Sequence, residues 1–269
     1  HPPLDADGTP HRRPLDADGA PDGRPLDGAA LALTFLTVIP IRPRRGVAAD
    51  LGRAAVWFPA VGALVGLLAG AVRTCSAALF GPAVASVLAL VVLVAVTGAL
   101  HQDGLADCAD GLGVRGDRKR RLAVMRDSAI GAFGTLALLG WALLLVGALA
   151  TLSDHAALRA LVTAAIVGRW AALVHATATA TARADGLGAS FTVARAPLIV
   201  ASAATIVAAV LIDGPVDGLA SVAAGAAVAG IASAWARRAL GGRTGDTLGA
   251  TVALAEVAVC LTLLAFATT

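Results

Sequence analysis

Long apolar runs alternate with short polar segments along most of the chain. They lie at about 54–72, 82–100, 130–152, 157–179, 197–212, 216–236 and 247–267. A helix needs about 20 residues to cross the hydrocarbon of a bilayer, and only the run at 197–212 falls clearly short of that length. The pattern predicts an all-α, polytopic integral membrane bundle of about seven transmembrane helices.

The chain before the first run divides into two parts. Residues 1–28 are rich in Asp and Pro and repeat the motif PLDADG, so we expect a disordered tail. The apolar run LALTFLTVIP at 31–40 is too short to span and ends at a proline, which favours an interfacial or re-entrant helix. Residues 29–269 are therefore expected to form one transmembrane catalytic domain.

Lysine and arginine are frequent in every second connection between the runs. The connection at 101–129 holds six of them, whereas the short connection at 213–215 holds none. Connections rich in positive charge face the cytoplasm. The rule places the N-terminus and the segments 42–53, 101–129, 180–196 and 237–246 on the cytoplasmic side.

Composition strengthens the membrane assignment. The residues are 58% hydrophobic and 14% charged, against about 25% charged in ordinary soluble domains. The three cysteines have no CxxC spacing, which argues against a disulfide framework or a zinc site. We expect the lipid bilayer and small molecules as partners and no nucleic acid, and a homo-oligomer is left open.

The most unusual polar stretch is HQDGLADCADG, which begins at residue 101, directly after an apolar run. If the run continues as a helix, Asp103, Asp107 and Asp110 lie at i, i+4 and i+7, within about 60° of one another. Clustered carboxylates repel unless a cation lies between them, and Mg²⁺ prefers oxygen ligands. These three are the candidate metal ligands, although they could also form a solvated helix end.

Basic residues and two glycine-containing loops accompany the acids on the predicted cytoplasmic side. The cluster Arg118, Lys119, Arg120 and Arg121, with Arg126, could bind phosphates or could only set topology and contact anionic lipids. Asp127 is either a helix cap or a fourth ligand. In GGRTGDTLGA, Asp246 is a cap or a catalytic carboxylate, and glycines at a helix start favour an anion.

Two charged residues lie deep inside the apolar runs, away from their ends. Arg169 and Glu256 are costly in hydrocarbon, and we expect them to form a buried ion pair. Most of the other polar groups gather at one membrane surface instead of the bilayer midplane, where a transporter would bind its substrate. The residues indicate a membrane enzyme that uses carboxylates, Mg²⁺ and basic side chains for phosphoryl transfer.

Several motifs resemble those of a known family. In chain order these are LTFLTVIP, WFPAVGALVG, HQDGLADCADGL, RLAVMRDSAIGAFG, the GRW of 168–170, ARADGLGASF and GGRTGDTLGA. They resemble the cobalamin-5′-phosphate synthases, also called adenosylcobinamide-GDP ribazoletransferases, from about residue 31 to 267. The acidic motif and the TGD motif carry most of the specificity.

The resemblance implies a reaction and a location. Adenosylcobinamide-GDP and α-ribazole, or its 5′-phosphate, would give adenosylcobalamin, or its 5′-phosphate, with release of GMP. The enzyme would depend on Mg²⁺ and lie in a bacterial inner membrane. The alternatives are a phosphatidyltransferase-like enzyme that uses a nucleotide-activated alcohol and, as a non-enzyme, a vitamin or ion transporter.

Mapped onto this chain, the resemblance assigns roles to the polar residues. The catalytic carboxylates would be Asp103, Asp107, Asp110, Asp127 and Asp246. The phosphate-binding residues would be Arg118, Lys119, Arg120, Arg121, Arg126, Arg183, Thr244 and Gly245. One carboxylate would accept the proton of the attacking ribose hydroxyl.

Overall fold

The computed structural model describes residues 25–41, 50–183 and 191–268, and its elements are helices. They are α1 (Pro25–Leu36), α2 (Leu51–Ala54), the 3-10 helix η1 (Ala55–Trp57), α3 (Phe58–Thr97), α4 (Leu100–Gly113), α5 (Arg118–Val124), α6 (Ala132–Thr151), α7 (Asp154–Ala178), α9 (Arg195–Asp213), α10 (Pro215–Leu240) and α11 (Gly245–Ala267). Six helical segments are long and apolar enough to cross a membrane. The predicted all-α membrane bundle is confirmed.

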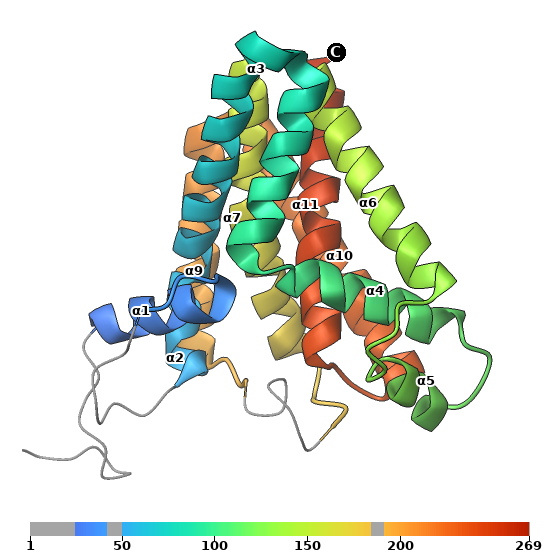
Figure 1. Ribbon diagram of the computed structural model, residues 1–269. Helices are drawn as coiled ribbons and strands as arrows, with labels where there is room; N and C mark the ends of the chain where they lie inside the picture. The colour runs from blue at the N-terminus through green and yellow to red at the C-terminus, as the bar shows by residue number, and fades with distance from the viewer. Residues whose placement is uncertain (1–24, 42–49, 184–190, 269) are drawn as a thin grey trace, which may run out of the picture.

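The first of these segments is a hairpin. Within α3, Gly81 has φ 77° and ψ 166°, outside the helical region, and Pro82 follows it. The Arg73 guanidinium donates from Nε to Ser86 Oγ at 2.9 Å. Thirteen residues of straight helix would put these groups about 20 Å apart, so the two arms lie side by side (Figure 1). The hairpin corresponds to the two predicted runs 54–72 and 82–100.

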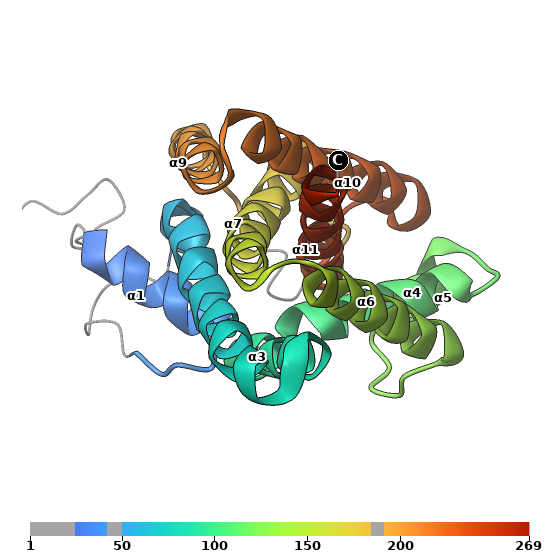
Figure 2. The same cartoon turned by 90° about the horizontal axis from the view of Figure 1, so that it is seen from above.

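Helix α7 occupies the middle of the bundle, and Figure 2 shows α3, α6, α9, α10 and α11 around it. Small residues allow this close packing, as is common between membrane helices. A Cβ atom added at Gly66 of α3 would meet Leu161 O of α7 at 2.6 Å, and one at Gly62 would overlap Ala165 O. The glycines thus let the two backbones touch.

Short helices gather at one end of the bundle. There α1, α2, α4 and α5 lie beside the lower ends of the long helices in Figure 1, and the Gly81 bend and the C-terminus lie at the opposite end. The described parts of the four predicted cytoplasmic segments all belong to the first end, which we call the α4 end. The pattern of basic residues therefore grouped these segments correctly in space.

Two boundaries differ from the sequence-based expectations. The second arm of α3 does not continue into the acidic stretch, because Gly98 and Ala99 both adopt left-handed φ angles, 60° and 58°. At the N-terminus α1 begins at Pro25, inside the segment expected to be a tail. It lies across the long helices (Figure 1), as expected of an interfacial helix. Residues 1–24 lie outside the described residues.

Candidate active site

The acidic stretch forms a separate amphipathic helix, α4, that lies across the ends of the long helices (Figure 1). Its buried positions are His101, Gln102, Gly104, Leu105, Ala106, Cys108 and Gly111. Asp103 is exposed, and Asp107 and Asp110 are half-buried. The i, i+4, i+7 spacing therefore holds within α4, on a helix that turns away from the preceding span.

The start of α11 packs against α4 and brings a fourth carboxylate to the acids. Thr244 Oγ1 accepts from the backbone N–H of Thr247 at 3.2 Å, which caps the helix. The same hydroxyl donates to Asp246 Oδ2 at 3.2 Å and so orients that carboxylate. A Cβ atom at Gly104 would lie 2.6 Å from Asp246 O, so only glycine permits this approach.

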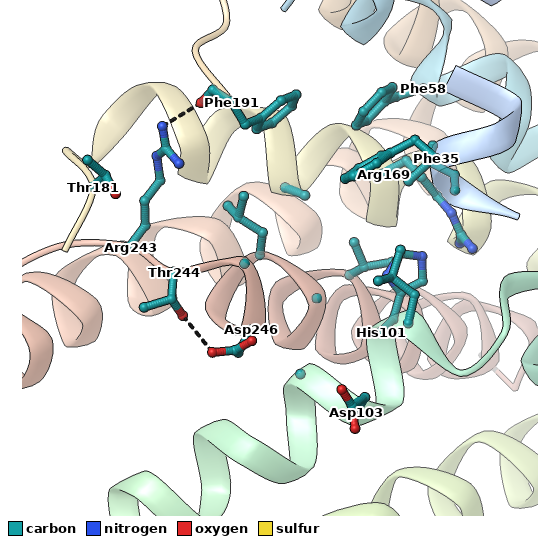
Figure 3. Close-up of a pocket in the computed structure, with 18 of the residues that line it drawn as sticks. Phe35, Phe58, His101, Asp103, Arg169, Thr181, Phe191, Arg243, Thr244 and Asp246 are labelled. Atoms are coloured by element: carbon teal, nitrogen blue, oxygen red, sulfur yellow. Dashed lines mark hydrogen bonds between the residues drawn. The ribbon is translucent and has the colours of Figure 1, made fainter. Parts of the chain in front are cut away.

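A cavity of about 340 Å³ opens between α4, α11, α7 and α1. Its polar lining includes two carboxylates, Asp103 and Asp246, together with Arg183, Thr244 and Gly245, all singled out from the sequence. Figure 3 shows Asp103, Thr244 and Asp246 beside residues that sequence reasoning did not assign to the site. The latter are Phe35, Phe58, His101, Arg169, Phe191 and Arg243.

The carboxylates interact electrostatically. Burial, as the largest cause, raises the pKa of the Asp107 carboxyl from its usual value near 3.8 to about 7. The negative charges of its neighbours add to this shift in the order Asp103, Asp246 and Asp110, and Arg183 acts against it. Arg183 Nη1 lies 4.0 Å from Asp246 Oδ2. The site holds more negative charge than the nearby guanidinium balances.

Asp110 and Asp127 both accept hydrogen bonds from backbone N–H groups. Asp110 accepts from the N–H groups of Gly131 at 2.7 Å and Gly134 at 2.9 Å, so it caps the start of α6. Asp127 was the residue expected to cap that helix if it had no catalytic role. Instead it is exposed and accepts from the N–H of Ala129 at 3.0 Å, within its own turn. Neither residue lines the cavity, and Asp107, one turn of α4 beyond Asp103, is not among the lining residues either.

The basic cluster lies beside the cavity. Arg118 donates from Nη2 to Ala182 O at 2.5 Å and thereby holds the chain segment before Arg183. The other members, Lys119, Arg120, Arg121 and Arg126, are exposed or half-buried and are not among the lining residues. Arg183 donates from Nη2 to Leu122 O at 2.8 Å and is the predicted phosphate-binding arginine that reaches the cavity.

Two buried arginines support the cavity. Arg169 pairs with Glu256, as predicted. Arg243 donates from Nε to Ala176 O at 3.1 Å and Thr179 O at 3.0 Å, and from Nη2 to Phe191 O at 2.5 Å. It thus ties the end of α7 to the segment that carries Phe191. Its place in the GGRTGDTLGA motif, directly before the cap residue Thr244, was the available sequence signal.

The carboxylate oxygens of the site are the kind of ligand that a hard cation such as Mg²⁺ prefers. The carboxylates repel one another, and this repulsion adds to the effect of burial on the pKa of Asp107. Mg²⁺ is usually held by one or two carboxylates plus substrate phosphates. Among the described residues, however, no three His, Cys, Asp or Glu side chains are already grouped around a common point for a metal ion. A cation here would therefore need ligands from the substrate as well.

Comparison with known proteins shows which family the chain resembles over most of its length. A family model described as Cobalamin-5-phosphate synthase matches residues 28–264. Adenosylcobinamide-GDP ribazoletransferase of Geotalea daltonii is 40% identical over 247 residues, which cover 87% of this chain and 96% of the relative. The proteins of that name from Rhizobium johnstonii and Escherichia coli (strain K12 / DH10B) are 39% and 35% identical, over 89% and 86% of this chain and 95% and 97% of the relatives. No solved structure matches.

Proposed function

The chain belongs to the cobalamin-5-phosphate synthase family, and we propose that it performs the family's transfer in the cavity between α4 and the start of α11. The transfer joins adenosylcobinamide-GDP to α-ribazole, or its 5′-phosphate, and makes cobalamin, or its 5′-phosphate, with release of GMP. The main support for placing the reaction there is the packing of Asp246 against Gly104. This packing adds the Asp246 carboxylate to those of α4.

The proposed chemistry is one displacement at phosphorus. A ribose hydroxyl of the α-ribazole attacks the phosphorus on the cobinamide side of the pyrophosphate. A new P–O bond forms, the P–O bond to the GMP phosphate breaks, and GMP leaves with the bonding electron pair. Asp107 accepts the hydroxyl proton, because a base with a pKa of about 7 is well matched to neutral pH.

The other polar groups bind the pyrophosphate. Asp103 and Asp246 would hold Mg²⁺, which when bound neutralises charge on the pyrophosphate and on the departing GMP. Arg183 lines the same cavity and donates to phosphate oxygens. Arg118, Lys119 and Arg120 are exposed beside it and attract the anionic substrate by their summed charge.

The proposed location is the inner membrane of a bacterium, with the α4 end in the cytoplasm. The support is the excess of Lys and Arg in the segments of that end, since such segments stay on the cytoplasmic side. Nucleotide-activated substrates made in the cytoplasm would then reach the cavity directly.

The test uses the full chain, purified and reconstituted in liposomes with Mg²⁺. Adenosylcobinamide-GDP and α-ribazole are supplied together, and GMP and the corrinoid product are separated and quantified. We expect the two products in equal amounts, and neither when one substrate is left out. Turnover of a nucleotide-activated lipid alcohol in place of this pair would overturn the proposal and favour a phosphatidyltransferase.

A further inference from the structure

Three phenylalanine rings from separate parts of the chain meet at one side of the cavity. Phe35 comes from α1, Phe58 begins α3, and Phe191 precedes α9. The ring centroids are 6.0 Å apart for Phe35–Phe58, 6.4 Å for Phe35–Phe191 and 5.6 Å for Phe58–Phe191, and the planes agree within 23°. We call them the phenylalanine cluster; Figure 3 shows it on the side of the cavity away from Asp103.

Next to the cluster lie two buried polar side chains with unused hydrogen-bonding groups. Arg169 is fully buried, and within the described part of the chain its Nε and Nη2 have no partner. His101 is 2% exposed, and neither of its ring nitrogens has a partner there. Both line the cavity. Buried donors without partners are rare in native proteins, which points to a ligand that supplies an acceptor.

The size and the apolar lining limit what that ligand is. At about 340 Å³ the cavity lies near the lower limit of small-molecule sites, ~300–1,000 Å³, which suits a nucleoside-sized group and not a whole corrinoid nucleotide. Leu36, Leu100 and Leu248 join the phenylalanine cluster in its wall. Guanine exposes several hydrogen-bond donors and acceptors that this wall of leucine and phenylalanine side chains could not satisfy.

We propose that the phenylalanine cluster and Arg169 form the binding site for the aromatic base of the acceptor nucleoside. The dimethylbenzimidazole of α-ribazole is flat and apolar and has one free ring nitrogen, an acceptor only. The base stacks on the cluster, and Arg169 donates to that nitrogen. The ribose then extends towards the carboxylates of α4 and α11. This assignment of the acceptor rests on the proposed function.

The first test measures binding without turnover. Equilibrium dialysis of labelled α-ribazole against the purified full chain gives a Kd for the wild type, Phe35→Leu and Phe80→Leu. Phe35 is half-buried on the short α1, so leucine keeps most of its packing. Phe80, beside the Gly81 bend, is 58% exposed and is the matched control.

We expect Phe35→Leu to raise the Kd about 10-fold, or about 1.4 kcal/mol, within the range for a base stacked on an aromatic ring. Phe80→Leu should leave it unchanged. An unchanged Kd in both variants would mean that the cluster serves only to pack α1 against α3, and would overturn the proposal. Because the readout is binding, a failure of the proposed reaction would be seen separately, as absent GMP release.

The second test leaves Arg169 in place, because its loss would also break the pair with Glu256. In the wild type, an acceptor nucleoside whose base has the free ring nitrogen replaced by C–H should bind about 10-fold more weakly than α-ribazole. Equal binding would exclude the hydrogen bond from Arg169. If Phe35→Leu weakens binding of adenosylcobinamide-GDP and not of α-ribazole, the site belongs to the donor substrate and the proposal is wrong.

Discussion

At the scale of single residues, burial and the repulsion of neighbouring carboxylates together raise the pKa of Asp107. Its carboxyl is half-buried and has other carboxylates as neighbours, and Arg183 compensates only part of their charge. A group in this environment is partly protonated near neutral pH. At pH 7 a large fraction of the carboxyl is ionised and can accept a proton. It is also a stronger base than an aspartate of ordinary pKa.

The raised pKa of Asp107 predicts how stability depends on pH in protein free of Mg²⁺. The pKa is about 7 in the folded state against 3.8 in the unfolded state, so the folded state binds the proton more tightly. This stabilisation is complete below pH 3.8 and is lost as the pH rises through about 7. Asp107→Asn should therefore melt at the same temperature as the wild type near pH 4 and at a higher temperature at pH 8.

Thermal unfolding in detergent with a chelator measures this difference. Asp127→Asn is the matched control, since Asp127 is exposed and bonds only within its own turn. The melting temperature of Asp107→Asn could instead fall relative to that of the wild type between pH 4 and pH 8. This result would mean that the ionised carboxylate stabilises the fold, and it would contradict the raised pKa of Asp107.

At the scale of helices, α4 connects the reactive groups to the bundle. Asp103 lines the cavity, Asp107 follows one turn further along the helix, and Gly104 packs on the start of α11. One turn further on, Asp110 holds the first turn of α6 through two backbone N–H groups. Three acids that look equivalent in the sequence therefore have different environments: Asp103 lines the cavity, Asp107 has a raised pKa, and Asp110 caps α6.

The cap formed by Asp110 predicts a loss of stability on truncation. Asp110→Ala should lower the free energy of unfolding by about 1–2 kcal/mol, as is typical for loss of a helix N-cap. Asp127→Ala should change it by less than about 0.5 kcal/mol, the usual range for exposed sites. Urea unfolding in mixed micelles compares the two, and an equal effect would refute the capping role.

The close contact at Gly104 predicts the effect of a single methyl group. Gly104→Ala would place a Cβ atom 2.6 Å from Asp246 O, so α4 and α11 must separate. Overpacking of this kind costs about 1–3 kcal/mol, and we expect GMP release to fall at least about 10-fold. Gly140→Ala in α6 has open space and is the control. Equal rates for the two variants would show that the site does not need this contact.

At the scale of the whole molecule, the membrane architecture could be predicted and the site only in part. Apolar length and the distribution of Arg and Lys found the spans and the segments that share the α4 end, because both follow from the physics of the bilayer. The acid spacing survived because it lies within one helix. The break at Gly98 and Ala99 was missed, since alanine rarely adopts a positive φ.

Long-range packing explains the remaining misses. The role of Asp110 depends on α6 returning to α4, with Gly131 and Gly134 leaving room for the carboxylate. Phe35, Phe58 and Phe191 lie far apart in the sequence and share no spacing. His101 lies inside the acidic motif, and only the fold places it together with Arg169 in the lining of the cavity.

The proposed orientation can be tested on the intact membrane. In a Cys75→Ser background, the remaining Cys108 and Cys260 are buried. Lys119→Cys, at the α4 end, should react with a membrane-impermeant maleimide only after the inner membrane is opened, whereas His155→Cys, at the other end, should react in spheroplasts. The reverse pattern would place the cavity outside the cytoplasm and contradict the proposed location.

The central claim is that the transfer takes place at the carboxylates shared by α4 and α11. Its most direct test is the rate of GMP release from adenosylcobinamide-GDP and α-ribazole in proteoliposomes with Mg²⁺, for the wild type, Asp107→Asn and Asp127→Asn. We predict a loss of at least about 100-fold for Asp107→Asn, the lower limit for a general base, and a rate within about 3-fold of the wild type for Asp127→Asn, since an exposed substitution away from the site has little effect. A wild-type rate in Asp107→Asn would contradict the account.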